Sequence, residues 1–345
     1  MAHPIRLGFP VKVLGDPTLK SNDSRRWQSN PHLRVSLEYL DGILAYLQKH
    51  NIRMYRMSSD IAPYATHPEM PQFHRQVVEC RSELEEFGKH ARELDIRLSF
   101  HPSQFIVINS PDPQIAAKSV WDLESQASIL DAMGCGPEAV MVIHAGGTYG
   151  DKESSRRRWV EAYRKLSEPV RRRLVLENDD TRFSAADVLA IHEETGVPLV
   201  FDNQHHWCLN PEMLGFEDTL AKFLRTWPSG VRPKIHFSSP RTEMREIVRN
   251  DKKTGKKKTV LQPPIWTGHA DYNHPFEFIR FLESHPNLDC DIMLEAKAKD
   301  LALIRLRNDV LRYAPHLASR LGLATTAVPE PELEELEVVP EMLTS

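Results

Sequence analysis

The sequence has few cysteines and no long hydrophobic run. Its four cysteines lie far apart, with neither a CxxC pair nor the spacing of a disulfide framework, and this predicts reduced thiols. No stretch reaches the roughly 18 consecutive apolar residues that a membrane-spanning helix needs. The first residues, MAHPIRLGFP, lack the basic and apolar regions of a secretory signal peptide. These absences predict a cytoplasmic protein that has no contact with a membrane.

The acidic excess is confined to one end of the chain. The formal net charge is −4, but residues 329–345 contain six glutamates and no basic residue, so that the remainder carries +2. We predict that the Glu- and Pro-rich segment 324–345 is disordered, because it offers little apolar surface to bury. A nearly neutral remainder neither favours nor excludes a polyanionic ligand.

Short apolar runs alternate with longer amphipathic segments along the chain. The amphipathic segments have helical spacing, as in the leucines and isoleucine of segment 37–47. This alternation is typical of repeated βα units around a parallel sheet, and one barrel of this kind takes about 250 residues or more. We therefore predict an α/β fold, a (β/α)8 TIM barrel, in a single domain over residues 1–320. The eight expected strands are residues 5–9, 52–57, 96–100, 139–144, 173–177, 198–202, 233–237 and 290–295.

One segment, residues 240–264, is longer than an ordinary βα loop. It carries six basic residues between Arg249 and Lys258, against Asp251 as the only acidic residue there. Its Lys-Thr-Gly-Lys centre is typical of a hairpin tip. Two interpretations remain open: the segment is a solvated charged turn, or it contacts the phosphate backbone of a nucleic acid.

Polar residues stand at the carboxyl ends of most expected strands, which is where the active site of such a barrel is built. A single histidine at a strand end is more often structural than a metal ligand. Seven consecutive βα units that each supply a histidine or a carboxylate are hard to obtain by chance, and the set predicts a metal site. The nine candidate ligands are His67, His101, His144, Glu177, Asp202, His205, His236, His269 and Glu295.

Six imidazoles and three carboxylates suit ions of the Zn, Mn or Fe type. Since a catalytic ion uses about three protein ligands and keeps a position open, nine ligands predict two or three ions. Such a positive site attracts phosphate and stabilises both oxygens of an in-line displacement. The residues alone therefore favour phosphodiester hydrolysis. Sugar isomerisation is the alternative, although barrels with that activity usually rely more on carboxylates and a lysine.

The other histidines are interpreted as ordinary residues. His50, His90 and His192 fall within expected helices. His206 directly follows His205 and is expected to point elsewhere, because successive residues of an extended segment alternate faces.

Several motifs resemble those of the UV damage endonucleases, a family that shares its metal-barrel plan with the endonuclease IV class. The resemblance covers roughly residues 5–300 and rests on IRLGFP, YRMSSDIAPYATHP, HPSQF, VIHAGGTYGDK, LVLENDD, LVFDNQHH, KIHFSS and MLEAKAK, in family order. It implies a TIM barrel with two or three divalent ions, usually manganese, with Zn²⁺, Mg²⁺ or Co²⁺ as alternatives. It also implies DNA repair: a nick immediately 5′ to cyclobutane dimers or 6-4 photoproducts, often with activity at abasic sites.

The resemblance also implies roles for individual residues. The nine candidates match the ligand positions of the family, with Glu177, His101 and Lys234 as catalytic residues. Lys234 is expected to face the same interior as His236; it is either carboxylated, as in some relatives, or neutralised in an ion pair. The family uses a Gln and an aromatic after the HP motif to probe the lesion. The expected DNA- or lesion-binding residues are Gln104, Phe105, Phe9, Lys256 and Lys257.

Alternatives to this function stay open. The same ligands would serve an abasic-site nuclease without photoproduct preference, and a sugar isomerase is a third, weaker possibility. A barrel that binds damaged DNA without cutting it would leave the metal set idle. The expected partner is UV-damaged double-stranded DNA, bound by a monomer that works at the bacterial nucleoid in the cytoplasm.

Overall fold

Eight parallel strands form a closed ring in the computed structural model, which describes residues 3–251 and 254–324. Hydrogen bonds join them in two groups, β3-β2-β1-β12-β7 and β4-β5-β6. Single bridges from Phe100 to Met141 and from Asp202 to His236 close the ring. The predicted TIM barrel is confirmed: seven strands lie inside their expected ranges, and β1 runs one residue past its own. The strands are β1 (Leu7–Pro10), β2 (Met54–Arg56), β3 (Arg97–Ser99), β4 (Met141–His144), β5 (Leu174–Glu177), β6 (Leu199–Val200), β7 (Lys234–Phe237) and β12 (Asp291–Leu294).

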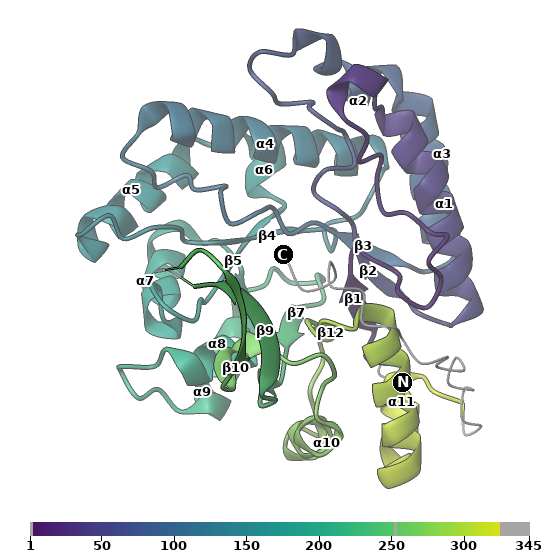
Figure 1. Ribbon diagram of the computed structural model, residues 1–345, viewed down its shortest axis with the longest axis vertical. Coiled ribbons are helices and arrows are strands. Elements are labelled where there is room, and N and C mark those ends of the chain that lie inside the picture. The colour runs from purple at the N-terminus through teal and green to yellow at the C-terminus, as the bar shows by residue number, and fades with distance from the viewer. Residues whose placement is uncertain (1–2, 252–253, 325–345) are drawn as a thin grey trace.

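Helices surround the ring (Figure 1). Leu37, Leu40, Leu44 and Leu47 all lie on the buried side of the first one, as their spacing predicts. The helices are α1 (Leu33–Lys49), α2 (Gln76–Glu79), α3 (Arg81–Glu93), α4 (Pro113–Ala132), α5 (Lys152–Lys165), α6 (Glu168–Arg171), α7 (Ala185–Thr195), α8 (Asn203–Cys208), α9 (Phe216–Arg225), α10 (Pro275–Ser284) and α11 (Lys299–Tyr313). Short 3-10 turns are Trp27–Ser29, Pro71–Phe73 and Pro315–Leu321.

Strand alternation divides the core into two layers. Residues such as Met141 and Ile143 face the helices and belong to the large hydrophobic cluster between sheet and helices. Val142, Val175 and Val200 form a second, small cluster. Because side chains in a strand alternate between faces, Glu177 shares the face of Val175. The chain thus places valines inside this part of the barrel and polar residues at the carboxyl ends of the strands.

The segment after β7 forms an antiparallel ribbon. β8 (Pro240–Arg241) pairs with β11 (Ile265–His269), and β9 (Arg245–Asn250) pairs with β10 (Lys257–Gln262). Gly255 in the turn has φ +68°, a left-handed conformation that glycine adopts readily. The predicted hairpin is confirmed. The ribbon begins and ends at the carboxyl-terminal rim, since β8 follows β7 and β11 ends at His269 (Figure 1).

A buried carboxylate fixes the loop after β1. Asp300, at the start of α11, accepts hydrogen bonds from the backbone N–H groups of Leu14 (2.7 Å) and Gly15 (2.9 Å) and from the Tyr46 hydroxyl (2.7 Å). One carboxylate therefore satisfies three donors from two different segments and holds that loop against the outer helices.

All four cysteines are free thiols, as expected. No helix in the described part of the chain has the length and apolar content needed to cross a bilayer. The acidic segment expected to be disordered lies, apart from its first residue, outside the described residues.

Candidate metal centre

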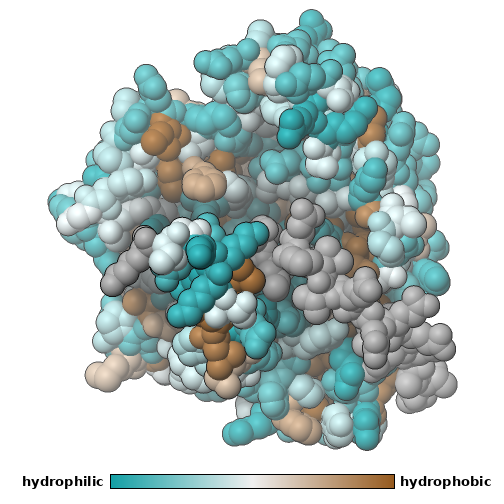
Figure 2. Space-filling model, in the orientation of Figure 1, coloured by the Kyte–Doolittle hydropathy of each residue, from teal (hydrophilic) through white to brown (hydrophobic). Residues whose placement is uncertain are grey.

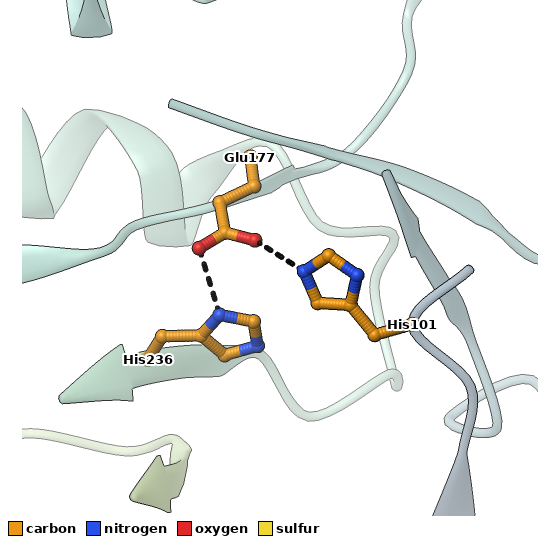
Figure 3. A group of neighbouring side chains, drawn as sticks. All are labelled: His101, Glu177 and His236. Carbon is orange, nitrogen blue, oxygen red and sulfur yellow. Dashed lines mark hydrogen bonds and ion pairs between the residues drawn. The ribbon is translucent and has the colours of Figure 1, made fainter. Parts of the chain in front are cut away.

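Glu177 lies at the centre of the rim, on the last residue of β5. It is fully buried and accepts a hydrogen bond from His236 Nδ1 (2.8 Å) through one carboxylate oxygen. Its other oxygen lies 3.1 Å from His101 Nε2 (Figure 3) and 3.7 Å from His144 Nε2. The register of β4 and β5 pairs His144 directly with Glu177. Three strands and the loop after β3 thus bring four predicted ligands together.

The carboxylates of Asp202 and Glu295 extend this cluster. Potential ligand atoms of Asp202, His205 and His269 lie within 4.8 Å of one another, and so do those of Glu177, Asp202, His236 and Glu295. Glu295 Oε1 lies 3.5 Å from His236 Nδ1, and Glu295 Oε2 lies 3.8 Å from His269 Nδ1. Shared members make these overlapping groups one continuous site.

Three histidines have the hydrogen bonds that are typical of metal ligands. Nδ1 of His101 donates to the Pro102 carbonyl (3.1 Å), that of His205 to the Asn178 carbonyl (2.9 Å) and that of His269 to the Glu295 carbonyl (2.9 Å). Ligating histidines usually donate one ring N–H to a carbonyl or carboxylate, which fixes the ring and leaves the other nitrogen for the ion. In each of these rings that nitrogen is Nε2.

Buried atoms without partners also fit a cation. Within the described part of the chain, Asp202 Oδ2, His236 Nε2 and His144 Nδ1 are buried and form no hydrogen bond. A buried polar atom without a partner costs about 1–3 kcal/mol, so several in one cluster indicate a missing interaction. Imidazole nitrogen and carboxylate oxygen are the ligands that zinc and manganese accept. The residues present therefore fit divalent ions.

The charges around the site lead to opposite pKa shifts in two histidines. Burial, helped by the Arg56 guanidinium, lowers the pKa of His101 to about 4 despite the nearby Glu177 carboxylate. Burial also acts to lower the pKa of His205, but Asp202 and Glu177 outweigh it and raise the value to about 9. His101 is thus neutral at pH 7, the form that binds a metal, and His205 lies in a negative field that attracts a cation.

Lys234 faces the barrel interior two residues before His236, as predicted, and is fully buried. Its Nζ has no hydrogen-bond or ion-pair partner among the described residues, so the expected alternative of an ion pair is wrong. Burial, then the charges of Arg97 and Arg56, lower the pKa of Lys234 well below its usual value. Its amine is therefore held unpaired below the cluster of ligands.

His67 stands apart from the other predicted ligands. It belongs to none of the three groups of converging ligand atoms found among the described residues. It lines a separate cavity of about 250 Å³, together with Asp60, Lys118 and Asp122. Eight of the nine candidates therefore converge, and the ninth lies in the loop after β2.

Two residues of the site were missed by the sequence reasoning. Arg56, the last residue of β2, forms an ion pair with Glu295. Asn178 bonds the backbone of Asp202 in both directions, with distances of 2.9 and 3.1 Å, besides accepting from His205. An arginine at the carboxyl end of an apolar strand, and the asparagine of LENDD, were the available signals.

The predicted DNA-binding residues differ in exposure. Gln104 and Phe105 lie in the loop after β3, and the Phe105 side chain is 75% exposed. Lys256 and Lys257 are exposed on the ribbon. Phe9 is 0% exposed and packs edge-on against Tyr55 in the layer between sheet and helices, so the expectation that it contacts DNA is wrong.

The separation of His206 from His205 has a different cause from the one expected. Both residues belong to the short helix α8 rather than to an extended segment, so about 100° of helical rotation separates them. His206 is buried against Phe201 and Phe216, away from the carboxylates.

Comparison with known proteins gives a consistent result. The model of the family described as UV-endonuclease UvdE matches residues 32–318. A UV DNA damage endonuclease of Bacillus velezensis is 37% identical over 265 residues, which are 76% of each chain. One of Bacillus cereus is 34% identical over 285 residues, 81% of each chain.

Solved structures extend the comparison to the fold. The crystal structure of SacUVDE superposes with a TM-score of 0.74 at 30% identity, and the match covers 93% of this chain and 100% of that one. The 3-keto-D-glucoside 4-epimerase of E. coli has a TM-score of 0.51 at 12% identity over 88% of this chain and 99% of that one. The second likeness shows the barrel fold alone.

Proposed function

Because this chain belongs to the UV-endonuclease UvdE family, we propose that it is a DNA repair endonuclease that nicks the damaged strand immediately 5′ to UV photoproducts. Cyclobutane dimers and 6-4 photoproducts are the proposed lesions, with abasic sites as a further substrate, and the cut leaves a 3′-hydroxyl and a 5′-phosphate. The observation that carries the proposal is the convergence of eight histidines and carboxylates on one rim. Such a set suits phosphodiester hydrolysis.

The proposed cofactors are two or three divalent ions, with Mn²⁺ preferred over Zn²⁺, Mg²⁺ or Co²⁺. Bound ions would lower the pKa of water and stabilise the oxygens that attack and leave the phosphorus. Glu177, Asp202 and His236 would hold more than one ion, since each belongs to two of the three groups. The proposal assigns this chemistry to a monomer, with residues 1–320 as its catalytic domain.

The surrounding residues have supporting roles in this proposal. Arg56 orients the Glu295 carboxylate through their ion pair. Asn178 holds Asp202 and His205 in place from the next strand. Lys234 is a catalytic residue in the proposal; burial lowers the pKa of its unpartnered amine, which favours the neutral form that carboxylation requires.

Lesion recognition is assigned to the loop after β3. Phe105 is an exposed aromatic ring next to Gln104 and within a few residues of the candidate ligand His101. Opening a base pair costs a few kcal/mol and costs least at a distorted site. An aromatic ring that fills the opened stack would stabilise that state by stacking. The ribbon lysines Lys256 and Lys257 are proposed to contact the phosphate backbone.

The test uses end-labelled duplexes that hold one cyclobutane dimer, one abasic site or no lesion. We expect Mn²⁺-dependent cleavage immediately 5′ to the dimer, its loss after chelation and no cut in the undamaged duplex. Cleavage of the abasic duplex alone would instead identify an abasic-site nuclease. Failure to cut any of the duplexes, combined with turnover of a sugar, would refute the proposal in favour of an isomerase.

A further inference from the structure

The ribbon has two chemically different faces. Residues that lie directly opposite each other in an antiparallel pair share a face. The register pairs Ile247 with Val260. It also pairs Arg249 with Lys258, which lie on the same face two residues closer to the tip of the hairpin. The other face carries Val248 with Thr259, Glu246 with Leu261 and Asn250 with Lys257.

The first of these faces is turned toward the protein. Ile247 and Val260 are half-buried, whereas Val248 and Leu261 are 64% and 60% exposed. Arg245, on the inner face, forms an ion pair with Asp271 in the segment that follows β11. The inner face is thus anchored near the rim, and its continuation toward the tip is the exposed pair of Arg249 and Lys258.

This pair places two positive charges directly opposite each other. Like charges in that arrangement destabilise a two-stranded sheet. Neither Arg249 nor Lys258 has an ion-pair partner among the described residues, and the only carboxylate on the paired strands, Glu246, lies on the other face. A ligand that bridged both cations would remove the repulsion, and that ligand has to be an anion.

We propose that Arg249 and Lys258 together bind one backbone region of the DNA, next to the cut strand, as a paired phosphate clamp. The inference rests on the proposed function for the identity of the anion. The clamp lies four residues beyond Arg245, which is about 13 Å along a strand and about four base-pair steps of DNA. In Figure 2 the ribbon lies near the middle of the face and is hydrophilic at its upper end, with hydrophobic patches lower down. Lys258 and Arg249 thus add a pair of phosphate contacts to those proposed for Lys256 and Lys257.

The experiment measures binding of an undamaged 30-base-pair duplex by fluorescence anisotropy between 50 and 200 mM salt. Each phosphate contact contributes about 0.9 to the slope of log K against log salt. The R249Q/K258Q variant should therefore have a slope smaller by about 1.8, so that the wild-type protein loses about 12-fold more affinity over this range. A control variant, R81Q/K89Q, removes two exposed charges from α3 on the outer layer.

A second variant, R249K/K258R, keeps both charges and should keep the wild-type slope. Hydrogen exchange of the ribbon amides supplies a structural readout: DNA should slow exchange in the wild-type ribbon, and R249Q/K258Q should slow it without DNA. An unchanged slope in R249Q/K258Q, or an equal fall in the control, would overturn the clamp.

Nicking of a dimer-containing duplex separates this inference from the proposed function. In single-turnover reactions with excess enzyme and Mn²⁺, R249Q/K258Q should keep its maximal rate within about twofold and need more protein to reach it. A wild-type protein that cuts while the variant binds with an unchanged slope refutes the clamp alone. A wild-type protein that cuts no lesion refutes the proposed function, whereas the salt slopes still report on the clamp.

Discussion

Replacement of Glu177 by glutamine is the most direct test of the metal centre. The change keeps the volume of the side chain and one oxygen acceptor but removes the negative charge. Glu177 contacts His236 and lies within 4 Å of His101, His144 and His205. Among the described residues, no other candidate ligand lies this close to four histidines of the site. Substitution of Glu177 should therefore weaken every ion site to which it contributes.

The expected effect can be estimated from the number of ligands lost. Removal of residues that merely orient a ligand costs about 10–100-fold in metal affinity or activity, so loss of a shared ligand should cost at least about 100-fold. That factor corresponds to about 2.7 kcal/mol in the barrier. The fold should survive, because one ring nitrogen that loses its acceptor costs about 1–3 kcal/mol. The melting temperature should therefore fall by only a few degrees.

The assay combines the nicking rate on a dimer-containing duplex, the bound metal measured by mass spectrometry and the far-ultraviolet circular dichroism. Glu277→Gln is the matched control, since Glu277 is exposed and bonds Ser239 outside the ligand groups. We expect native dichroism, lower metal content and at least about 100-fold slower nicking for Glu177→Gln alone. Nicking within threefold of wild type at saturating Mn²⁺ would refute a shared ligand.

Four further substitutions test other parts of the structure. Phe105→Ala should weaken binding of dimer-containing DNA about 5- to 150-fold, the range for loss of a base stack, and leave thermal stability unchanged; equal affinity would argue against a wedge. Lys234→Met should raise the melting temperature of protein treated with a chelator, since an unpaired buried polar group costs about 1–3 kcal/mol. The same substitution should slow nicking, and a lower melting temperature would contradict the reasoning. Asp300→Ala should destabilise the protein by about 3 kcal/mol or more in urea titrations, because two backbone N–H groups and the Tyr46 hydroxyl lose their acceptor; a loss below 1 kcal/mol would show that water replaces it. His67→Ala should slow nicking less than His101→Ala, because His67 lies outside the converging groups of ligand atoms. An equal loss of nicking in the two variants would show that the loop after β2 closes on the metals.

The barrel could be predicted because its signals are local. Runs such as 139–144 and 173–177 are buried on both faces, and burial on both faces makes a strand apolar along its length. The polar exceptions at their ends, His144 and Glu177, then stood out against that background. Strand register brought the two together without any further information.

The errors came from contacts that depend on three-dimensional packing. Phe9 follows the same apolar pattern whether its ring faces DNA or Tyr55, so the sequence could not distinguish the two. The helix α8 is only six residues long, too short for helical periodicity to be recognised. Arg56 was overlooked because its partner Glu295 is 239 residues away in the chain.

The ring closure of the barrel has a consequence for how this protein would lose its structure. β6 and β7 are joined through a single bridge, and the residues of that bridge are Asp202 and His236, both candidate ligands. An ion bound by both side chains would therefore cross-link β6 and β7, one of the two strand pairs in the barrel that are connected by a single bridge. Loss of either side chain would then weaken the contact between β6 and β7 as well as the binding of the ion. Substitutions at these two positions would therefore reduce both stability and activity.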